Sequence, residues 1–164
     1  MFLTVSSPFT TEMLDRTLTE FLEQGLATHI GTRNARMEPN GCRVTAVRVD
    51  DQGRQLIAYL PKAATPAVLA DLRDNGQAAL SFARPSDDRA VQVKGQFIDW
   101  RDADDSEQAF VLGQLEALLR QMELIGIPAT ASSTWKMWPC IVVRIRVTAI
   151  FSQTPGPDAG AVLS

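Results

Sequence analysis

The sequence predicts a mainly β protein, an antiparallel barrel of about six strands with helices at its periphery. Six segments have strand character, because apolar and polar residues alternate or a short apolar run is bounded by turn residues. Most of them follow one another through short turns, which is typical of hairpins rather than of a parallel βαβ sheet. The 164 residues contain no internal repeat and no low-complexity linker, so we expect one domain over residues 1–164.

The first predicted element is a helix over residues 11–24. Its apolar residues recur at the helical spacing i, i+4, i+7 and i+8, at Leu14, Leu18, Phe21 and Leu22. Thr10 or Thr11 is a suitable N-cap, and Gly25 is of the residue type that most often ends a helix.

The strands are predicted at residues 26–32, 42–49, 55–60, 77–84, 89–99 and 141–151. The turn sequence Asp50-Asp51-Gln52-Gly53 joins the second and third strands as a hairpin. A tail over residues 152–164 follows the last strand.

Two further helices are predicted between these strands. One begins at Pro66, with Thr65 as its N-cap, and ends at Asn75-Gly76. The other covers residues 105–124. The acidic residues around its start are interpreted as helix-start residues rather than a metal or acid/base cluster, because carboxylates are favourable at the positive end of a helix dipole. They are Asp102, Asp104, Asp105 and Glu107.

The composition argues against several kinds of partner. The chain has 16 Lys and Arg against 19 Asp and Glu, a net charge of −3, with no basic cluster, so we expect no nucleic-acid binding. Arg144 and Arg146 interrupt the longest apolar stretch, so no membrane span is expected. The N-terminus lacks the pattern of a signal peptide, and two cysteines far apart in sequence are expected to stay reduced. These features favour a cytoplasmic protein.

A single histidine, His29, excludes many catalytic mechanisms. No HExxH helix or two-histidine iron site can form, and a zinc site would need His29, Cys42, Cys140 and a carboxylate to converge without any short ligand spacing. The GxSxG nucleophile motif and the phosphate-binding motifs GxxxxGK and GxGxxG are absent. We therefore expect no metal and no catalytic side chain, and any chemistry would belong to a bound cofactor.

Arginines lie at both ends of the strand segment Arg43-Val-Thr-Ala-Val-Arg48. Strand alternation predicts that Arg43 and Arg48 face opposite sides, so one flat strand cannot direct both at one ligand. Two interpretations stay open: exposed arginines on a barrel rim, or arginines that bind an anionic ligand between two subunits.

Two other segments are candidate contact sites. The loop over residues 59–64 leads into a helix whose N-terminus favours anions, and Thr65 and Lys62 can add to it. In the last strand, Arg144 and Arg146 share one face. Three roles remain open for them: exposed residues on the barrel exterior, partners in a salt bridge between subunits, or contacts to an anion. The tryptophans before it, Trp135 and Trp138, are interpreted as packing or interface residues.

Taken together, these segments resemble the FMN-binding split-barrel superfamily, the pyridoxamine 5′-phosphate oxidase-like proteins. The resemblance covers residues 15–100 and the last strand with its Thr-Pro-Gly-Pro tail, and it depends on the order and spacing of the elements. It implies an antiparallel split β-barrel that forms a homodimer, with FMN held at the subunit interface.

Individual positions follow from the same resemblance. Residues 43–48 match a family strand, Arg-x-Val-Leu-Leu-Lys, that runs along the flavin, and residues 66–68 stand where the family's Ser-Arg-Lys holds the phosphate. Neither the arginine nor the lysine of that family motif is present at these positions, and the nearest hydroxyl belongs to Thr65. The implied cofactor-binding residues are Arg43, Val44, Thr45, Ala46, Val47, Arg48, Tyr59, Leu60, Lys62, Thr65 and Gln92.

The function implied by the resemblance is an FMN-binding oxidoreductase acting on a small-molecule substrate. A second possibility is a non-catalytic, stress-related member of the superfamily that holds flavin or another ligand weakly or not at all. A haem-binding relative is a third possibility, in which His29 would be the only histidine ligand.

Overall fold

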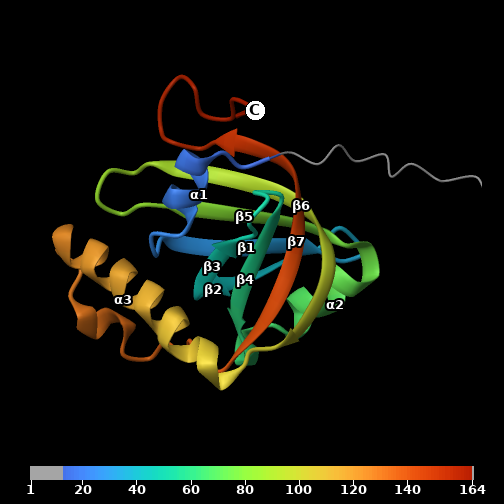
Figure 1. The fold of residues 1–164 in the computed structure, drawn as a ribbon, viewed down its shortest axis with the longest axis horizontal. Coiled ribbons are helices and arrows are strands. Elements are labelled where there is room, and N and C mark those ends of the chain that lie inside the picture. Colours follow the sequence, from blue (N-terminus) through green and yellow to red (C-terminus); the bar gives the residue numbers. More distant parts are fainter. Residues whose placement is uncertain (1–12, 164) are drawn as a thin grey trace, which may run out of the picture.

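The computed structural model of the chain describes residues 13–163 and contains one curled antiparallel sheet (Figure 1). Its strands are β1 (Ala27–Arg33), β2 (Pro39–Val44), β3 (Ala46–Val49), β4 (Gln55–Pro61), β5 (Gln77–Ala83), β6 (Ala90–Asp102) and β7 (Cys140–Ser152). They are paired in the order β2-β1-β5-β6-β7-β4-β3, and every pairing is antiparallel. The prediction of a mainly β, antiparallel split barrel is confirmed.

The described residues form seven strands rather than about six, because the strand predicted at 42–49 is interrupted at Thr45. Before Thr45 the chain pairs with β1 as β2, and after it the chain pairs with β4 as β3. The Thr45 N–H donates to the Tyr59 carbonyl (2.8 Å), which fixes the start of the new pairing. The two edge strands of the sheet are therefore consecutive in sequence, so the sheet curls until its edges meet.

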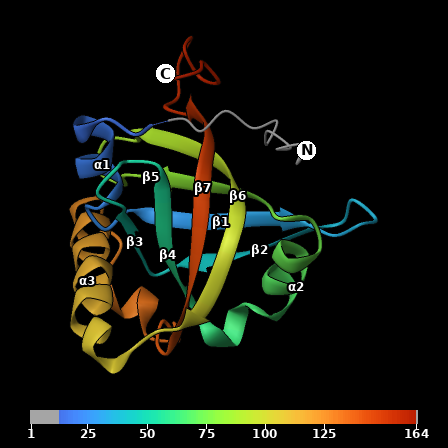
Figure 2. The same cartoon turned by 45° about the vertical axis from the view of Figure 1, so that its right-hand side comes forward.

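The inward-facing residues of all seven strands build the main core inside the curled sheet. Two helices close its ends: α1 (Arg16–Leu22) contributes Phe21 and Leu22, and α2 (Pro66–Asn75) contributes Val68 and Leu72. Figure 2 shows these helices at opposite ends of the barrel. Each such side chain stabilises the fold by about 1.5–3 kcal/mol on burial, so packing holds both short helices in place.

The third helix, α3 (Gln108–Leu124), lies on the outside of the barrel rather than at an end (Figure 1). Its residue Val111 packs against outward-facing residues of β3, β4 and β7 in a second, smaller cluster that also holds Ala46, Tyr59, Cys140 and Val142. The short helix η2 (Asp105–Glu107) leads into α3, and η3 (Ala129–Ser132) follows it. The segment from η2 to η3 thus covers one part of the outer face.

The first helix is shorter than predicted. The helix expected over residues 11–24 is observed at Arg16–Leu22, and residues 11–12 lie outside the described part of the chain. Its N-cap is Asp15, whose carboxylate accepts the Leu18 N–H (2.7 Å), instead of Thr10 or Thr11. The sequence pattern identified the apolar face but not the residue that caps it.

The starts and ends of the other helices agree with the sequence pattern. Thr65 occupies the N-cap position of α2, and Gly76, with φ of 71°, ends that helix in the left-handed conformation. Asp104 and Glu107 form a capping box at the start of η2, the short helix that leads into α3. Asp104 and Glu107 therefore act as helix-start residues, as the sequence indicated, whereas Asp102 ends β6 and pairs with Lys62.

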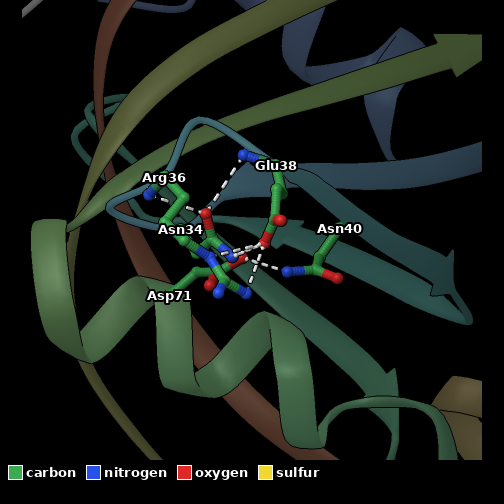
Figure 3. A network of polar contacts seen from close by, with 5 residues as sticks. All are labelled: Asn34, Arg36, Glu38, Asn40 and Asp71. Atoms are coloured by element: carbon green, nitrogen blue, oxygen red, sulfur yellow. Dashed lines mark hydrogen bonds and ion pairs between the residues drawn. The ribbon is translucent and has the colours of Figure 1, made fainter.

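The carboxylate of Asp71, in a residue only 5% exposed, fastens α2 to the β1–β2 hairpin. It accepts hydrogen bonds from Thr32 Oγ1 of β1 (2.7 Å) and Asn40 Nδ2 of β2 (2.8 Å). Figure 3 shows Asn40 reaching Asp71 from the hairpin, with Asn34 and Glu38 bonded to each other in the turn. This network fixes the start of β2 relative to the helix that follows β4.

Neither cysteine forms a disulfide in the structure. Cys42 is half-buried and Cys140 is buried, and burial raises the pKa of both thiols to about 11. Across residues 13–163, no three His, Cys, Asp or Glu side chains are grouped so that they could hold a metal ion. The helices of the same residues include none with the length and apolar character needed to cross a bilayer.

We expect Asp71→Ala to destabilise the protein by about 1–3 kcal/mol, because the Thr32 hydroxyl and the Asn40 amide would lose their shared acceptor in a buried place. Urea unfolding would measure the loss. Asp74→Ala, which removes an exposed carboxylate from the same helix, should change the free energy of unfolding by less than about 0.5 kcal/mol. Equal effects in the two variants would contradict a role for this network.

Candidate functional site

A groove of about 430 Å³ lies where β2, the connection from β4 to α2 and the segment before β7 meet. The Lys62 N–H donates to the Pro139 carbonyl (2.8 Å), which holds two of these segments together. The groove volume lies within the range of about 300–1,000 Å³ that is usual for small-molecule sites. Its lining residues are Gly41, Cys42, Arg43, Pro61, Ala63, Ala64, Thr134, Trp135, Lys136 and Met137.

Arg43 provides the groove with a guanidinium that no acidic residue in the described part of the chain neutralises. Its Cζ lies 4.0 Å from the centroid of the Trp135 ring, so the two groups stack. Within residues 13–163, the side chain has no carboxylate partner and donates no hydrogen bond. Stacking engages the face of the guanidinium, and its N–H edge can bind a phosphate or carboxylate of a ligand.

Arg43 and Arg48 lie on the same side of the sheet, which corrects the prediction that they face opposite sides. Val44 and Val47 both point into the main core although they are three positions apart, because the break in the strand interrupts the alternation. Arg48 stacks on Phe110 of α3, its Cζ 3.7 Å from the ring centroid, and Arg43 stacks on Trp135 in the segment before β7, so both arginines face outward. Strand alternation predicted that only a ligand between two subunits could contact both arginines. Because both face the same side, a second subunit is not required for this.

The strand segment between these arginines is occupied by protein contacts. The Val47 N–H donates to Gln114 Oε1 (2.9 Å), and Gln114 Nε2 donates to the Val47 carbonyl (2.8 Å). Ala46 lies beneath α3 and Thr45 donates through its N–H to β4. A flavin ring would reach the backbone of Val47 only by displacing Gln114.

Tyr59 and Leu60 are buried and do not line the groove. Leu60 points into the main core, whereas Tyr59 lies beneath the start of α3 and donates its hydroxyl to Glu107 Oε1 (2.8 Å). Burial, together with this bond, raises the pKa of Tyr59 to about 12. Glu107 accepts two further bonds from Arg101 (2.7 and 2.8 Å), which hold its pKa at about 2.

The two polar groups expected near the start of α2 have protein partners. Lys62 Nζ lies 2.6 Å from Asp102 Oδ1, in an ion pair on the surface. The Thr65 hydroxyl donates to the Lys62 carbonyl (3.0 Å), and Thr65 is only 3% exposed. Neither side chain lines the groove, although Ala63 and Ala64 between them do.

Gln92 lies outside the groove but on the same face of the sheet as Arg43. The strand register places Arg43, His29, Ser81 and Gln92 opposite one another on β2, β1, β5 and β6. Three strand spacings separate Arg43 from Gln92, about 14 Å. Partial burial, followed by the charge of Arg43, lowers the pKa of His29. A polar row therefore extends from the groove across the sheet.

The face that carries this row consists largely of small residues and is not covered by α3. On β1, β5 and β6 they are Ala27, Gly31, Ala79, Ser81, Ala83 and Ala90, all exposed or half-buried. A hollow of about 440 Å³ lies on the same face, beside Arg33 and Lys94. At the small residues of this uncovered face, another surface can approach the sheet closely.

Sequence analysis missed two residues that shape the site. Lys136 lines the groove from the segment before β7, and no motif marked it. Gln114 caps the edge of β3, and its position held a usable signal, because it lies three residues after Val111 on the buried stripe of a helix. A polar residue in such a stripe needs a buried partner.

We expect Glu107 to contribute stability that acid removes. Its pKa is about 2 in the folded protein, below its ordinary 4.5, so the contribution is complete above pH 4.5 and is lost as the pH falls towards 2. Glu107→Gln should therefore lose less unfolding free energy than the wild type across this range, measured by urea unfolding at each pH. Glu116→Gln, an exposed change on α3, should keep the wild-type pH dependence. An unaltered pH dependence in Glu107→Gln would contradict the assignment.

The chain is similar in structure to several solved proteins at low sequence identity. HupZ of Group A Streptococcus is 17% identical, with 90% of this chain and 100% of that chain covered and a TM-score of 0.54. An FMN-binding protein from Syntrophomonas wolfei is 14% identical, with coverages of 84% and 87% and a TM-score of 0.52.

A protein from Clostridium acetobutylicum that is related to general stress protein 26, of the pyridoxinephosphate oxidase family, is 12% identical. It covers 87% of this chain and 92% of its own, with a TM-score of 0.52. No family model and no curated protein matches the sequence. The similarity is therefore one of fold, and the chain has the split β-barrel fold of the pyridoxamine 5′-phosphate oxidase-like proteins.

Proposed function

We propose that the protein binds FMN in the Arg43 groove and acts as a flavin-dependent oxidoreductase. The observation that carries this proposal is the Arg43 guanidinium, stacked on Trp135 and without a neutralising partner among residues 13–163. The groove is of ligand size, and no Asp or Glu lines it, so an anionic, aromatic molecule fits its chemistry. The similarity to a solved FMN-binding protein favours a flavin as that molecule.

In this proposal the flavin, when bound, supplies the electron transfer, and the chain supplies binding and shielding. Arg43 holds a negatively charged part of the ligand with its N–H edge. Trp135, Pro61 and Met137 form apolar walls on the protein side of the ligand. No side chain of the groove needs to act as an acid or base. We expect the protein to work in the cytoplasm, where its thiols stay reduced.

We further propose that the protein forms a homodimer through the uncovered face of β1, β5 and β6. Small side chains there let a second sheet approach closely, and the polar row from Arg43 to Gln92 would lie at the edge of the contact. A second copy packed on this face would also enclose the open side of the groove, which one chain leaves exposed to solvent.

A non-catalytic flavin-binding protein is the second candidate. The contacts of α3 favour it, because Gln114 occupies both backbone groups of Val47 and Glu107 holds Tyr59. A flavin in the groove would then have α3 beside it, on the side of β3, and this helix would limit the approach of a substrate to the flavin ring. A reduction assay separates the two candidates: bleaching of bound FMN by a reduced nicotinamide cofactor, which gives up a hydride and is itself oxidised, supports the oxidoreductase, and flavin that stays oxidised supports the non-catalytic protein.

Titration with FMN, followed by flavin fluorescence, tests cofactor binding. We expect one FMN per chain, and Arg43→Met should weaken binding about ten- to hundredfold, the contribution of a charge-assisted hydrogen bond. Arg89→Met is the matched control, because Arg89 also stacks on an aromatic ring (4.2 Å from Phe21) but far from the groove. Absence of binding, or equal weakening in both variants, would refute the assignment of Arg43.

Light scattering tests the proposed dimer. We expect a mass of about 36 kDa, twice the 18.0 kDa of the chain. Ser81→Arg places a long charged side chain on the uncovered face and should yield monomers, whereas Ser86→Arg, in an exposed loop, should leave the mass unchanged. A wild-type mass near 18.0 kDa at micromolar concentration rules the dimer out.

A further inference from the structure

We propose that Lys136, together with Arg43, binds the phosphate group of the ligand in the groove. The inference rests on the proposed function, since it assumes that FMN is the ligand, and it assigns the anion-binding charge to the segment before β7. The proposed subsite is the part of the groove lined by Arg43, Trp135 and Lys136.

The charge of the groove is the first argument. Arg43 and Lys136 are the cationic side chains among its lining residues, and none of those residues is acidic. Across residues 13–163, neither cation forms an ion pair. In a chain whose net charge is −3, two unneutralised cations in one groove form a local site for an anion.

The surroundings of α2 are the second argument, because the side chains at the start of this helix offer little to an anion. Pro66 has no N–H to donate, and the Thr65 hydroxyl is already bonded to a backbone carbonyl. Lys62 is paired with Asp102 instead of reaching the groove. Ala63 and Ala64 therefore form an uncharged wall, and the cations stand on the other segments that line the groove.

The third argument is that the backbone around Lys136 is fixed. The carbonyl of Met137, a residue 7% exposed, accepts the Thr45 hydroxyl (3.1 Å) and the Cys140 thiol (3.1 Å). On the other side of Lys136, the Trp135 ring is stacked with Arg43. The exposed Lys136 side chain thus extends from a backbone that is already ordered. Binding an anion would therefore cost only the conformational entropy of the side chain.

A comparison of FMN with riboflavin, which lacks the phosphate, tests the proposal. We expect the wild type to prefer FMN by at least about tenfold, and Lys136→Met to lower the affinity for FMN about tenfold while the affinity for riboflavin stays unchanged. Arg16→Met, which removes a highly exposed cation from α1 at the other end of the barrel, is the matched control and should keep the preference. Thermal unfolding of each variant checks that the fold is intact.

The possible failures are distinguishable. If both flavins bind the wild type equally, or if Lys136→Met weakens both to the same extent, the phosphate subsite is wrong while flavin binding stands. A selective loss of FMN affinity in Lys62→Met, with none in Lys136→Met, also overturns the proposal and places the phosphate at the start of α2. If the folded wild type binds neither flavin, the proposed function fails together with the subsite.

Discussion

The transfer of one strand from one edge of the sheet to the other, at Thr45, is the constraint on which the other features of the structure depend. The N–H of this residue bonds to the Tyr59 carbonyl, and its hydroxyl bonds to the Met137 carbonyl (3.1 Å). The first bond begins the pairing of β3 with β4, and the second holds the segment before β7 against the barrel. One residue therefore closes the sheet and fixes one wall of the groove.

The same transfer determines where the charged side chains of the strand point. A regular strand would place Arg43 and Arg48 on opposite faces. Because the alternation is broken between them, both face outward: Arg48 stacks on Phe110 of α3, and Arg43 stacks on Trp135 in the segment before β7. Arg48 becomes part of the packing against α3, whereas Arg43 remains at the open end and belongs to the groove.

The outside of the barrel is divided between a covered part and an uncovered part. The covered part lies beneath α3, where Gln114 satisfies the exposed backbone of an edge strand and Glu107 joins Tyr59 to Arg101. An uncapped edge would invite pairing with another chain, so this cover protects the β3 side. The uncovered part, over β1, β5 and β6, carries small residues and the polar row, and the groove lies where these two parts meet.

The elements and the fold class follow from the amino-acid sequence, because periodicity and turn residues are local properties. The strand positions, the Thr65-Pro66 start of α2, the acidic start of the third helical segment and the antiparallel arrangement could all be predicted from neighbouring residues. The sequence also marked Arg43 as an unusual charge in an apolar strand. Only the tertiary structure decided that the strand divides at Thr45, since its cause is a hydrogen bond to Tyr59, fourteen residues away. The same holds for the groove: Lys136 lies more than ninety residues after Arg43, and no local pattern records that folding brings the two together.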